Sequence, residues 1–257
     1  MIKKIKIKDI ENELETLEID AALERIAYIQ EEYGVSLKKL FEKYSKRRAA
    51  SLKEYERYQK MCRYENDACK KGIKLIAGID EAGRGPLAGP VVAAAVILPE
   101  GIFIEGLDDS KKLTPGKRET LFDIIKEKAL SYGVGIIDEK CIDEINILNA
   151  TRKAMALAVR SLKLRPELLL IDAEKLQNLN INQISIIKGD TLSVSIAAAS
   201  VVAKVTRDRM ICELDKVYPQ YGFAKHKGYG TKEHIDAIKK YGICPIHRIS
   251  YTKNFTG

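Results

Sequence analysis

The sequence has no long apolar run and no close pair of cysteines. No stretch of its 257 residues approaches the roughly 18 consecutive apolar residues that cross a bilayer, so we expect no membrane contact. The N-terminal segment MIKKIKIKDIENELE has neither an apolar core nor a small-residue cleavage site, so no signal peptide is predicted. The five cysteines form no CxxC pair, which argues against a zinc site and a disulfide framework. These absences predict a cytoplasmic protein with reduced thiols.

The composition is that of a soluble globular protein, and the charge is basic. Hydrophobic residues make up 46% and charged residues 31% of the chain, and the net charge is +8. From Lys204 to the end, Lys and Arg outnumber Asp and Glu by 11 to 5. Such a region favours a polyanionic partner, although a solvated surface explains the charge equally well.

The N-terminal part differs in character from the rest. It contains a single glycine, Gly34, and no proline. Apolar residues recur at near-helical spacing over 10–23 and 37–58, which predicts amphipathic helices with a break near Gly34. We therefore assign residues 1–71 to a helical extension and residues 72–257 to a main domain that ends in a helical region.

The main domain alternates short apolar runs with helical segments. Five runs predict strands, at Ile73–Ile79, Val91–Leu98, Tyr132–Ile137, Glu167–Ile171 and Gln183–Ile187. Helices are predicted over about 143–163, over 192–217 and after Thr231 as N-cap. This order predicts an α/β fold with a mixed five-stranded sheet flanked by helices, in which antiparallel strands come first. The link 173–182 is short for a parallel crossover.

Acidic residues follow three of the predicted strands. Asp80 and Glu81 follow the first, Asp172 the fourth and Asp190 the fifth. If these strands run in one direction, their carboxyl ends meet at one edge of the sheet, where such folds bind ligands. Two like charges about 4 Å apart repel by roughly 4 kcal/mol at an effective dielectric near 20, so four carboxylates need divalent cations or protons. All-oxygen ligation suits Mg²⁺ or Mn²⁺, and two such ions can clamp a phosphodiester during cleavage.

On the pattern alone, a purely structural role for the same acids is an open alternative. Acidic residues at strand ends are common as turn formers and helix caps. Asp138 also follows an apolar run, YGVGII, and nothing in the pattern separates it from the other acids.

Five longer segments carry a family resemblance. They are GIDEAGRGPLAGPVVAAAVIL (Gly78–Leu98), DSKKL (Asp109–Leu113), INILNAT (Ile145–Thr151), KGDTLSVSIAAASVVAKVTRDR (Lys188–Arg209) and YPQYGFAKHKGYGT (Tyr218–Thr231). Each resembles a segment of ribonuclease HII, the bacterial type 2 ribonuclease H family, and they occur in the family's order. The resemblance spans about Gly72 to Arg248.

The resemblance implies a ribonuclease H-like fold and a catalytic domain with a two-metal site for Mn²⁺ or Mg²⁺. Asp80, Glu81, Asp172 and Asp190 match the family's metal-binding carboxylates, and Asp138 becomes a turn or cap. The implied activity is endonucleolytic, on the RNA strand of RNA-DNA hybrids and 5′ of single ribonucleotides in duplex DNA. It leaves 5′-phosphate and 3′-hydroxyl ends and serves ribonucleotide and primer removal. We expect a monomer.

Two further elements of the resemblance concern the sugar. Gly83, Arg84 and Gly85 match the loop that recognises the ribose 2′-hydroxyl, the group that distinguishes RNA from DNA. Tyr229 matches the tyrosine that packs against the deoxyribose just 3′ of the ribonucleotide. Together they would read an RNA-to-DNA step.

Four basic side chains are weaker candidates. Lys111, Lys112 and Arg207 are expected to contact phosphate, with a solvated role as the alternative for each. His226 is expected either near the substrate or in a structural hydrogen bond.

Three other functions are compatible with parts of the pattern. They are a DNA-cutting nuclease on the same fold, a hybrid-binding protein without turnover, and non-specific binding through basic charge. The extension itself could grip the duplex, pack on the main domain or contact another protein.

Overall fold

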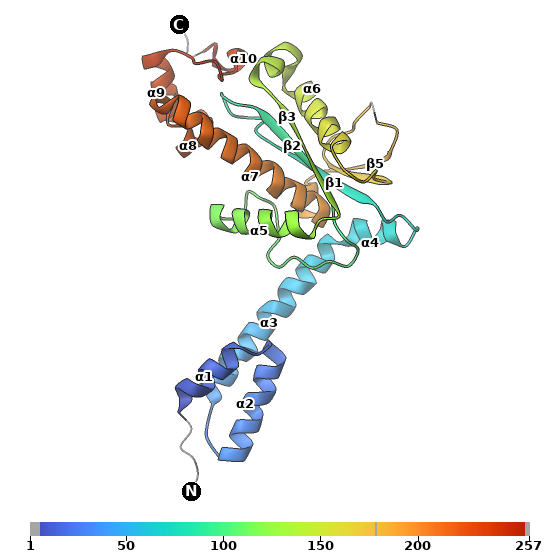
Figure 1. The fold of residues 1–257 in the computed structure, drawn as a ribbon, viewed down its shortest axis with the longest axis vertical. Helices are drawn as coiled ribbons and strands as arrows, with labels where there is room; N and C mark the ends of the chain where they lie inside the picture. The colour runs from blue at the N-terminus through green and yellow to red at the C-terminus, as the bar shows by residue number, and fades with distance from the viewer. Residues whose placement is uncertain (1–5, 178, 255–257) are drawn as a thin grey trace. The chain divides into compact units, whose positions relative to one another are not determined.

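The chain forms two compact units in the computed structural model, which describes residues 6–177 and 179–254. The first unit ends at Gln59 and is helical (Figure 1). It contains α1 (Ile7–Glu15), α2 (Ile19–Tyr33) and most of α3 (Lys38–Met61). Its core consists of apolar faces of these helices: Ile10, Leu14, Ala22, Ile26, Ile29, Leu37, Leu40 and Tyr44. Gly34 ends α2 in the left-handed conformation, which confirms the predicted helix break.

The second unit, from Lys60 onward, is built on the mixed five-stranded sheet that the sequence predicts. Its strands are β1 (Ile76–Ala82), β2 (Val91–Ile97), β3 (Ser131–Ile137), β4 (Leu168–Asp172) and β5 (Asn182–Ile186). The order is β3-β2-β1-β4-β5. β2 pairs antiparallel with β1 and β3, whereas β4 pairs parallel with β1 and β5. The parallel pairing across the short 173–182 link is therefore confirmed.

Two long helices cover opposite faces of the sheet (Figure 1). Ala77 and Ile79 of β1 belong to the apolar cluster that includes Ala154 of α6 (Glu139–Arg160). Gly78 lies between them and faces α7 (Val194–Val217), because a Cβ at Gly78 would lie 2.0 Å from the backbone carbon of Ser195. Only glycine permits this approach of helix and strand, which brings α7 against the centre of the sheet.

Shorter helices complete the second unit. They are α4 (Arg63–Cys69), α5 (Pro115–Lys128), the 3-10 turns η1 (Gly189–Thr191) and η2 (Pro219–Tyr221), α8 (Phe223–His226), α9 (Lys232–Tyr241) and α10 (Ile249–Thr252), besides the long α7 (Val194–Val217). Thr231 caps α9 as predicted, with its hydroxyl accepting the His234 N–H. The sequence interpretation omits α5, although Thr114 caps it and Pro115 opens it.

Helix α4 is tied to the start of α7. The Glu65 carboxylate accepts hydrogen bonds from Ser193 Oγ at 2.5 Å and from the Ser195 N–H at 3.0 Å. Ser193 is itself the N-cap of α7. The carboxylate therefore satisfies an amide and a hydroxyl at the positive end of the helix that directly follows Asp190. In the structure α4 therefore belongs to the second compact unit, which starts at Lys60.

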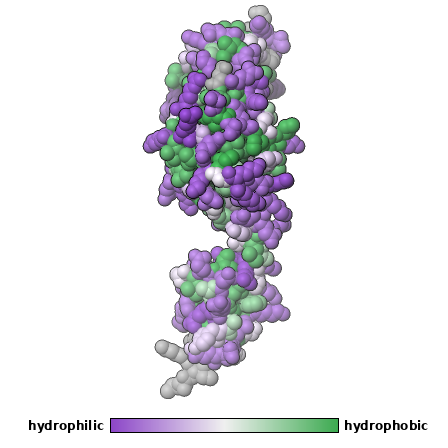
Figure 2. Space-filling model, turned by 90° about the vertical axis from the view of Figure 1, so that its right-hand side faces the viewer, coloured by the Kyte–Doolittle hydropathy of each residue, from purple (hydrophilic) through white to green (hydrophobic). Residues whose placement is uncertain are grey.

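The described surface is largely polar. Figure 2 shows hydrophilic residues over much of the visible face, with apolar residues in separate groups. Within residues 6–177 and 179–254, no helix is both long and apolar enough to span a membrane.

Replacing Glu65 with Ala should destabilise the second unit by about 1–3 kcal/mol, because a buried helix end loses its acceptor. Glu65→Gln should cost less, since an amide oxygen can still accept both hydrogen bonds. Asp67→Ala on the same helix is the control, because its exposed carboxylate contacts Arg63 and Lys70 at 4.0 and 3.6 Å. Urea unfolding measures all three, and equal midpoints for Glu65→Ala and Asp67→Ala would refute the assignment.

Candidate active site

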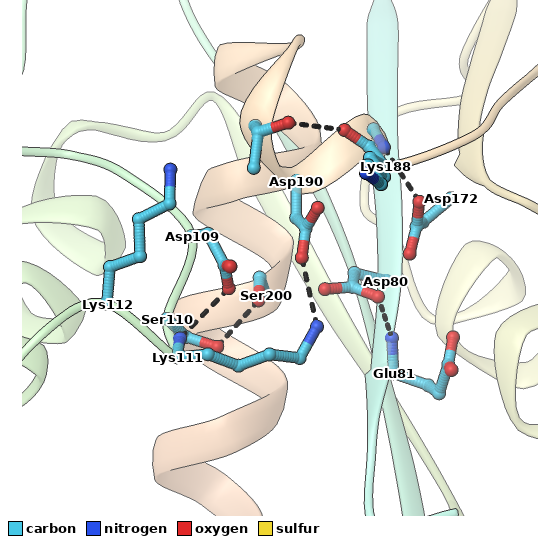
Figure 3. A network of polar contacts seen from close by, with 12 residues as sticks. Asp80, Glu81, Asp109, Ser110, Lys111, Lys112, Asp172, Lys188, Asp190 and Ser200 are labelled. Atoms are coloured by element: carbon cyan, nitrogen blue, oxygen red, sulfur yellow. Dashed lines mark hydrogen bonds and ion pairs between the residues drawn. The ribbon is translucent and has the colours of Figure 1, made fainter.

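The predicted acids come together at one edge of the sheet, where β1, β4 and β5 all run in one direction. Asp80 lies in β1, Asp172 ends the neighbouring β4, and Asp190 lies in η1 just after β5. Figure 3 shows the carboxylates of these three residues turned toward one another. Glu81 follows Asp80 in β1 and so points to the other face of the strand, where its Oε1 lies 3.4 Å from Arg84 Nη1.

Two oxygens of this cluster are buried without compensation. Asp80 is 3% exposed, and its Oδ1 accepts the Glu81 N–H at 2.7 Å. Asp80 Oδ2 and Glu81 Oε2 have no hydrogen-bond partner among the residues that the structure describes. Asp172 is better satisfied, since its Oδ1 accepts the Gly189 N–H at 2.7 Å. An unpaired buried carboxylate oxygen is costly, so these two atoms call for a cation or a proton.

Burial and mutual repulsion raise the pKa values of three of the acids. Desolvation and the charges of Glu81 and Asp172 raise the pKa of Asp80 well above its usual range. Desolvation also raises the pKa of Glu81 and of Asp172, although Arg84 opposes the rise at Glu81. The folded protein thus holds negative charge here at a cost that a bound divalent cation would remove.

A lysine supplies part of the missing positive charge. Lys111 Nζ lies 3.0 Å from Asp190 Oδ2, whereas Lys112 Nζ lies 3.0 Å from Asp108 Oδ1 and points away from the cluster (Figure 3). Desolvation lowers the pKa of Lys111, but its contacts with Asp190 outweigh that effect and raise it overall. Of the two lysines named from sequence, the structure therefore brings Lys111 to the acids and not Lys112.

The carboxylates are not arranged as a preformed metal site. In the described part of the chain, no group of three or more His, Cys, Asp or Glu side chains has the arrangement of a ready metal site. The chemistry of the donors nevertheless fits Mg²⁺ or Mn²⁺, because all are carboxylate oxygens and two of them lack other partners.

The predicted sugar-reading residues lie side by side. Gly83 has φ +97°, and a Cβ there would lie 2.1 Å from Arg207 Nε, so only glycine fits. A Cβ at Gly85 would lie 3.7 Å from Tyr229 Cε1, which places the tyrosine ring next to the loop. Tyr229 is 45% exposed, so its ring is available to a ligand.

Arg207 is not placed to contact phosphate, contrary to expectation. Its side chain is 1% exposed and donates to the carbonyls of Pro90, Lys227 and Ala88 at 2.9, 3.0 and 3.1 Å. A buried guanidinium needs hydrogen-bond acceptors, and these three backbone carbonyls supply them. Arg207 therefore connects the segment just before Tyr229 to the segment just after Gly85.

Two other residues were missed from sequence. Arg248, also fully buried, donates to the carbonyls of Gly83, Arg84 and Gly89. This residue near the C-terminus thus fixes the glycine loop, Gly83–Gly85. Its one signal is its place at the end of the segment that carries the resemblance. Glu174, two residues after Asp172, accepts Arg152 Nε at 3.0 Å and lies 3.9 Å from Arg84.

The two remaining candidates have structural roles. Asp138 is the N-cap of α6, with its Oδ1 accepting the Cys141 N–H at 2.8 Å, which confirms the turn-or-cap interpretation. His226 Nε2 lies 2.8 Å from the carbonyl of Tyr221, so the structural alternative holds.

The mixed sheet, with acids in or just after three parallel strands, defines a hydrolase of the ribonuclease H type. The chain belongs to the ribonuclease HII family, since the family model described as Ribonuclease HII matches residues 77–254. It is 64% identical to the ribonuclease HII of Acetivibrio thermocellus over 249 residues, 97% of each chain, and 56% identical to that of Ruminiclostridium cellulolyticum over 251 residues, 98% of each. It is accordingly a ribonuclease H.

Solved structures agree with this placement. The ribonuclease H2 of Pyrococcus horikoshii matches with a TM-score of 0.59 at 31% identity, covering 70% of this chain and 96% of that one. The ribonuclease HII of Archaeoglobus fulgidus, solved as a complex with PCNA, matches with a TM-score of 0.58 at 27% identity, covering 69% and 95%. The predicted ribonuclease H-like fold is therefore confirmed.

Asp80→Asn should stabilise the metal-free protein at neutral pH, because it removes a buried carboxyl whose pKa is raised well above its usual range by desolvation and by neighbouring acids. The sign follows from the raised pKa: the penalty on wild type is full above that pKa, shrinks as pH falls below it, and disappears only below the lower pKa of Asp80 in the unfolded chain. Thermal unfolding in a chelator at pH 7.5 measures it. Asp138→Asn, outside the cluster, should change little, and a destabilised Asp80→Asn would contradict the account.

Proposed function

We propose that the chain is an endonuclease that cuts the RNA strand of RNA-DNA hybrids and cuts 5′ of single ribonucleotides in duplex DNA. The observation that carries this proposal is the pair of unpartnered oxygens on Asp80 and Glu81, beside Asp172 and Asp190. Membership of the ribonuclease HII family supports the substrate class. Products with 5′-phosphate and 3′-hydroxyl ends, and a cytoplasmic role in removing ribonucleotides and RNA primers from DNA, follow from the same proposal.

Asp80, Glu81, Asp172 and Asp190 would hold two ions of Mg²⁺ or Mn²⁺. Such ions, when bound, supply charge stabilisation at the attacking and leaving oxygens of the phosphodiester. Asp80, the most buried of the four, would be a ligand together with the other three acids. Lys111 Nζ, which now contacts Asp190, would then be free to contact a substrate phosphate.

The glycine loop and Tyr229 would choose the cleavage position. Arg248 donates to the Gly83 carbonyl, and Arg207 donates to the Pro90 carbonyl in the segment that follows the loop, so both arginines fix the loop. Its remaining backbone groups can then approach a ribose 2′-hydroxyl. The exposed ring of Tyr229 would pack on the next sugar, where a 2′-hydroxyl would spoil the contact. The two contacts together favour an RNA-to-DNA step.

A duplex with one embedded ribonucleotide should be cut once, on the 5′ side of that ribonucleotide, in Mg²⁺ or Mn²⁺. Asp80→Asn should abolish the cut, because the site loses its most buried anion, and Asp138→Asn should retain it. Gel mapping of end-labelled strands measures the position. Equal cutting of an all-DNA duplex would identify a general nuclease, and tight binding without turnover would identify a silent hybrid-binding protein.

Lys111→Ala should lower kcat/KM on this duplex by roughly tenfold, the effect of one lost charged hydrogen bond. Lys112→Ala is the matched control and should leave kcat/KM within about twofold, because its ammonium contacts Asp108 instead. Steady-state kinetics compares the two. Equal losses for both variants would show that general positive charge, and not the position of Lys111, matters.

A further inference from the structure

The chain's three histidines form one buried cluster behind Tyr229. His226 ends α8, His234 lies in the first turn of α9, and His247 precedes α10. They are 8%, 0% and 2% exposed. The rings of His226 and His234 stack with centroids 4.4 Å apart, and Phe223 packs against all three rings. None of the three touches the carboxylates of the active site in a contact that the structure describes.

The hydrogen bonds of His234 and His247 fix their tautomers. His234 Nδ1 lies 2.9 Å from the Tyr229 carbonyl, which can only accept, so Nδ1 carries the hydrogen. The bare Nε2 of a neutral His234 then faces His247 Nε2 at 3.0 Å, so His247 Nε2 must donate. The opposite end supports the same pattern: His247 Nδ1 accepts the Cys244 N–H at 2.9 Å, which is shorter than its contacts with Cys244 Sγ at 3.1 Å and with the Cys244 carbonyl at 3.3 Å. The two ends agree on one arrangement of protons.

His226 is fixed in the same way. Its Nε2 donates to the Tyr221 carbonyl at 2.8 Å, and its Nδ1 accepts the Gly228 N–H at 3.2 Å. All three rings are therefore neutral and fully paired. Burial lowers the pKa of His234 to about 4 and also lowers that of His247, which agrees with neutral rings.

The backbone of Tyr229 is hydrogen-bonded at both its N–H and its carbonyl, and one of the partners is the His234 ring. The Tyr229 N–H donates to the carbonyl of His226 at 3.0 Å. The Tyr229 carbonyl accepts from the His234 ring and from the Thr231 N–H, the latter at 2.8 Å. The tyrosine backbone is thereby fixed while its ring stays exposed next to Gly85.

The other end of the chain of rings reaches the segment after the glycine loop. His247 forms an antiparallel bridge with Ala88. Its neighbours continue the contact, since the Arg248 N–H donates to the Leu87 carbonyl at 2.9 Å and the Gly89 N–H to the Ile246 carbonyl at 2.8 Å. Histidine hydrogen bonds thus connect the backbone of Tyr229 to the segment that carries Gly85.

We propose that His234 and His247 are positioning residues that hold Tyr229 over Gly85 and so set the preference for an RNA-to-DNA step. The proposal rests on the proposed function, in which Tyr229 packs on the sugar 3′ of the ribonucleotide. His234 acts through the Tyr229 carbonyl, and His247 acts by holding His234 in the less common Nδ1–H tautomer. Neither ring touches the substrate.

The tautomers can be measured on the unaltered full chain. Long-range ¹H–¹⁵N correlation spectra at pH 7.5 should show three neutral imidazoles, one protonated at Nδ1 and two at Nε2. Three signals suffice because the chain has three histidines. The Nδ1–H pattern should vanish in His234→Asn. Three Nε2–H patterns, or rapid averaging of His234 and His247, would overturn the proposal whatever the enzyme cleaves.

The role in selectivity is tested by a double-mutant cycle. The measured quantity is kcat/KM on a duplex with one ribonucleotide divided by kcat/KM on a long hybrid. His234→Ala should lower this ratio by about tenfold, the effect of one buried hydrogen bond. His234→Asn should restore most of it, because its amide N–H can replace Nδ1–H. In a Tyr229→Ala background, His234→Ala should have no further effect on the ratio.

The outcomes separate the two proposals. If Tyr229→Ala lowers the ratio and His234→Ala lowers it further by the same factor, the histidine acts elsewhere and this inference fails. If Tyr229→Ala leaves the ratio unchanged, the proposed reading of the sugar by Tyr229 fails instead, and the spectra still decide the tautomers.

Discussion

Repulsion between buried carboxylates is the constraint around which the second unit is organised. Asp80, Asp172 and Asp190 lie at one edge because three parallel strands deliver them there, and the fold accepts a raised pKa at Asp80 and Asp172 to keep them together. Natural proteins tolerate such destabilised groups where a function needs them. Two interactions keep the acids in place against that repulsion: the hydrogen bond between Glu65 of α4 and Ser193 at the start of α7, and the ion pair between Lys111 and Asp190.

A second set of hydrogen bonds surrounds the loop Gly83–Gly85, for which we propose recognition of the sugar. Two buried arginines and a chain of neutral histidines satisfy backbone carbonyls that a glycine-rich loop cannot satisfy by itself. The loop therefore combines glycine's access to unusual conformations with a rigid setting. Rigid placement of this kind is what discrimination between sugars that differ by one hydroxyl requires.

Much of this architecture could be predicted from the sequence, because apolar runs of strand length and their terminal acids are local signals. The five strands, the mixed sheet and the convergence of the acids on one edge follow from such runs. Asp138 shows the limit, since the same local pattern yields a helix cap two strands away from Asp80. Helix α5 could have been found from its Thr114-Pro115 start.

The rest depended on contacts between distant segments. Glu65 and Ser193 are 128 residues apart, so nothing local shows that α4 caps α7. Arg207 and Arg248 look like surface cations in sequence, and only the carbonyls that the loops present make their burial possible. The roles considered for the helical extension stay predictions, as does the domain boundary at residue 71.

The account is tested most directly by anomalous scattering from crystals of the wild-type protein grown in Mn²⁺. It predicts anomalous peaks between Asp80, Asp172 and Asp190, with Lys111 Nζ displaced from Asp190. Peaks only elsewhere on the molecule, with the Lys111–Asp190 contact intact, would contradict the claim that these carboxylates are gathered to hold divalent ions.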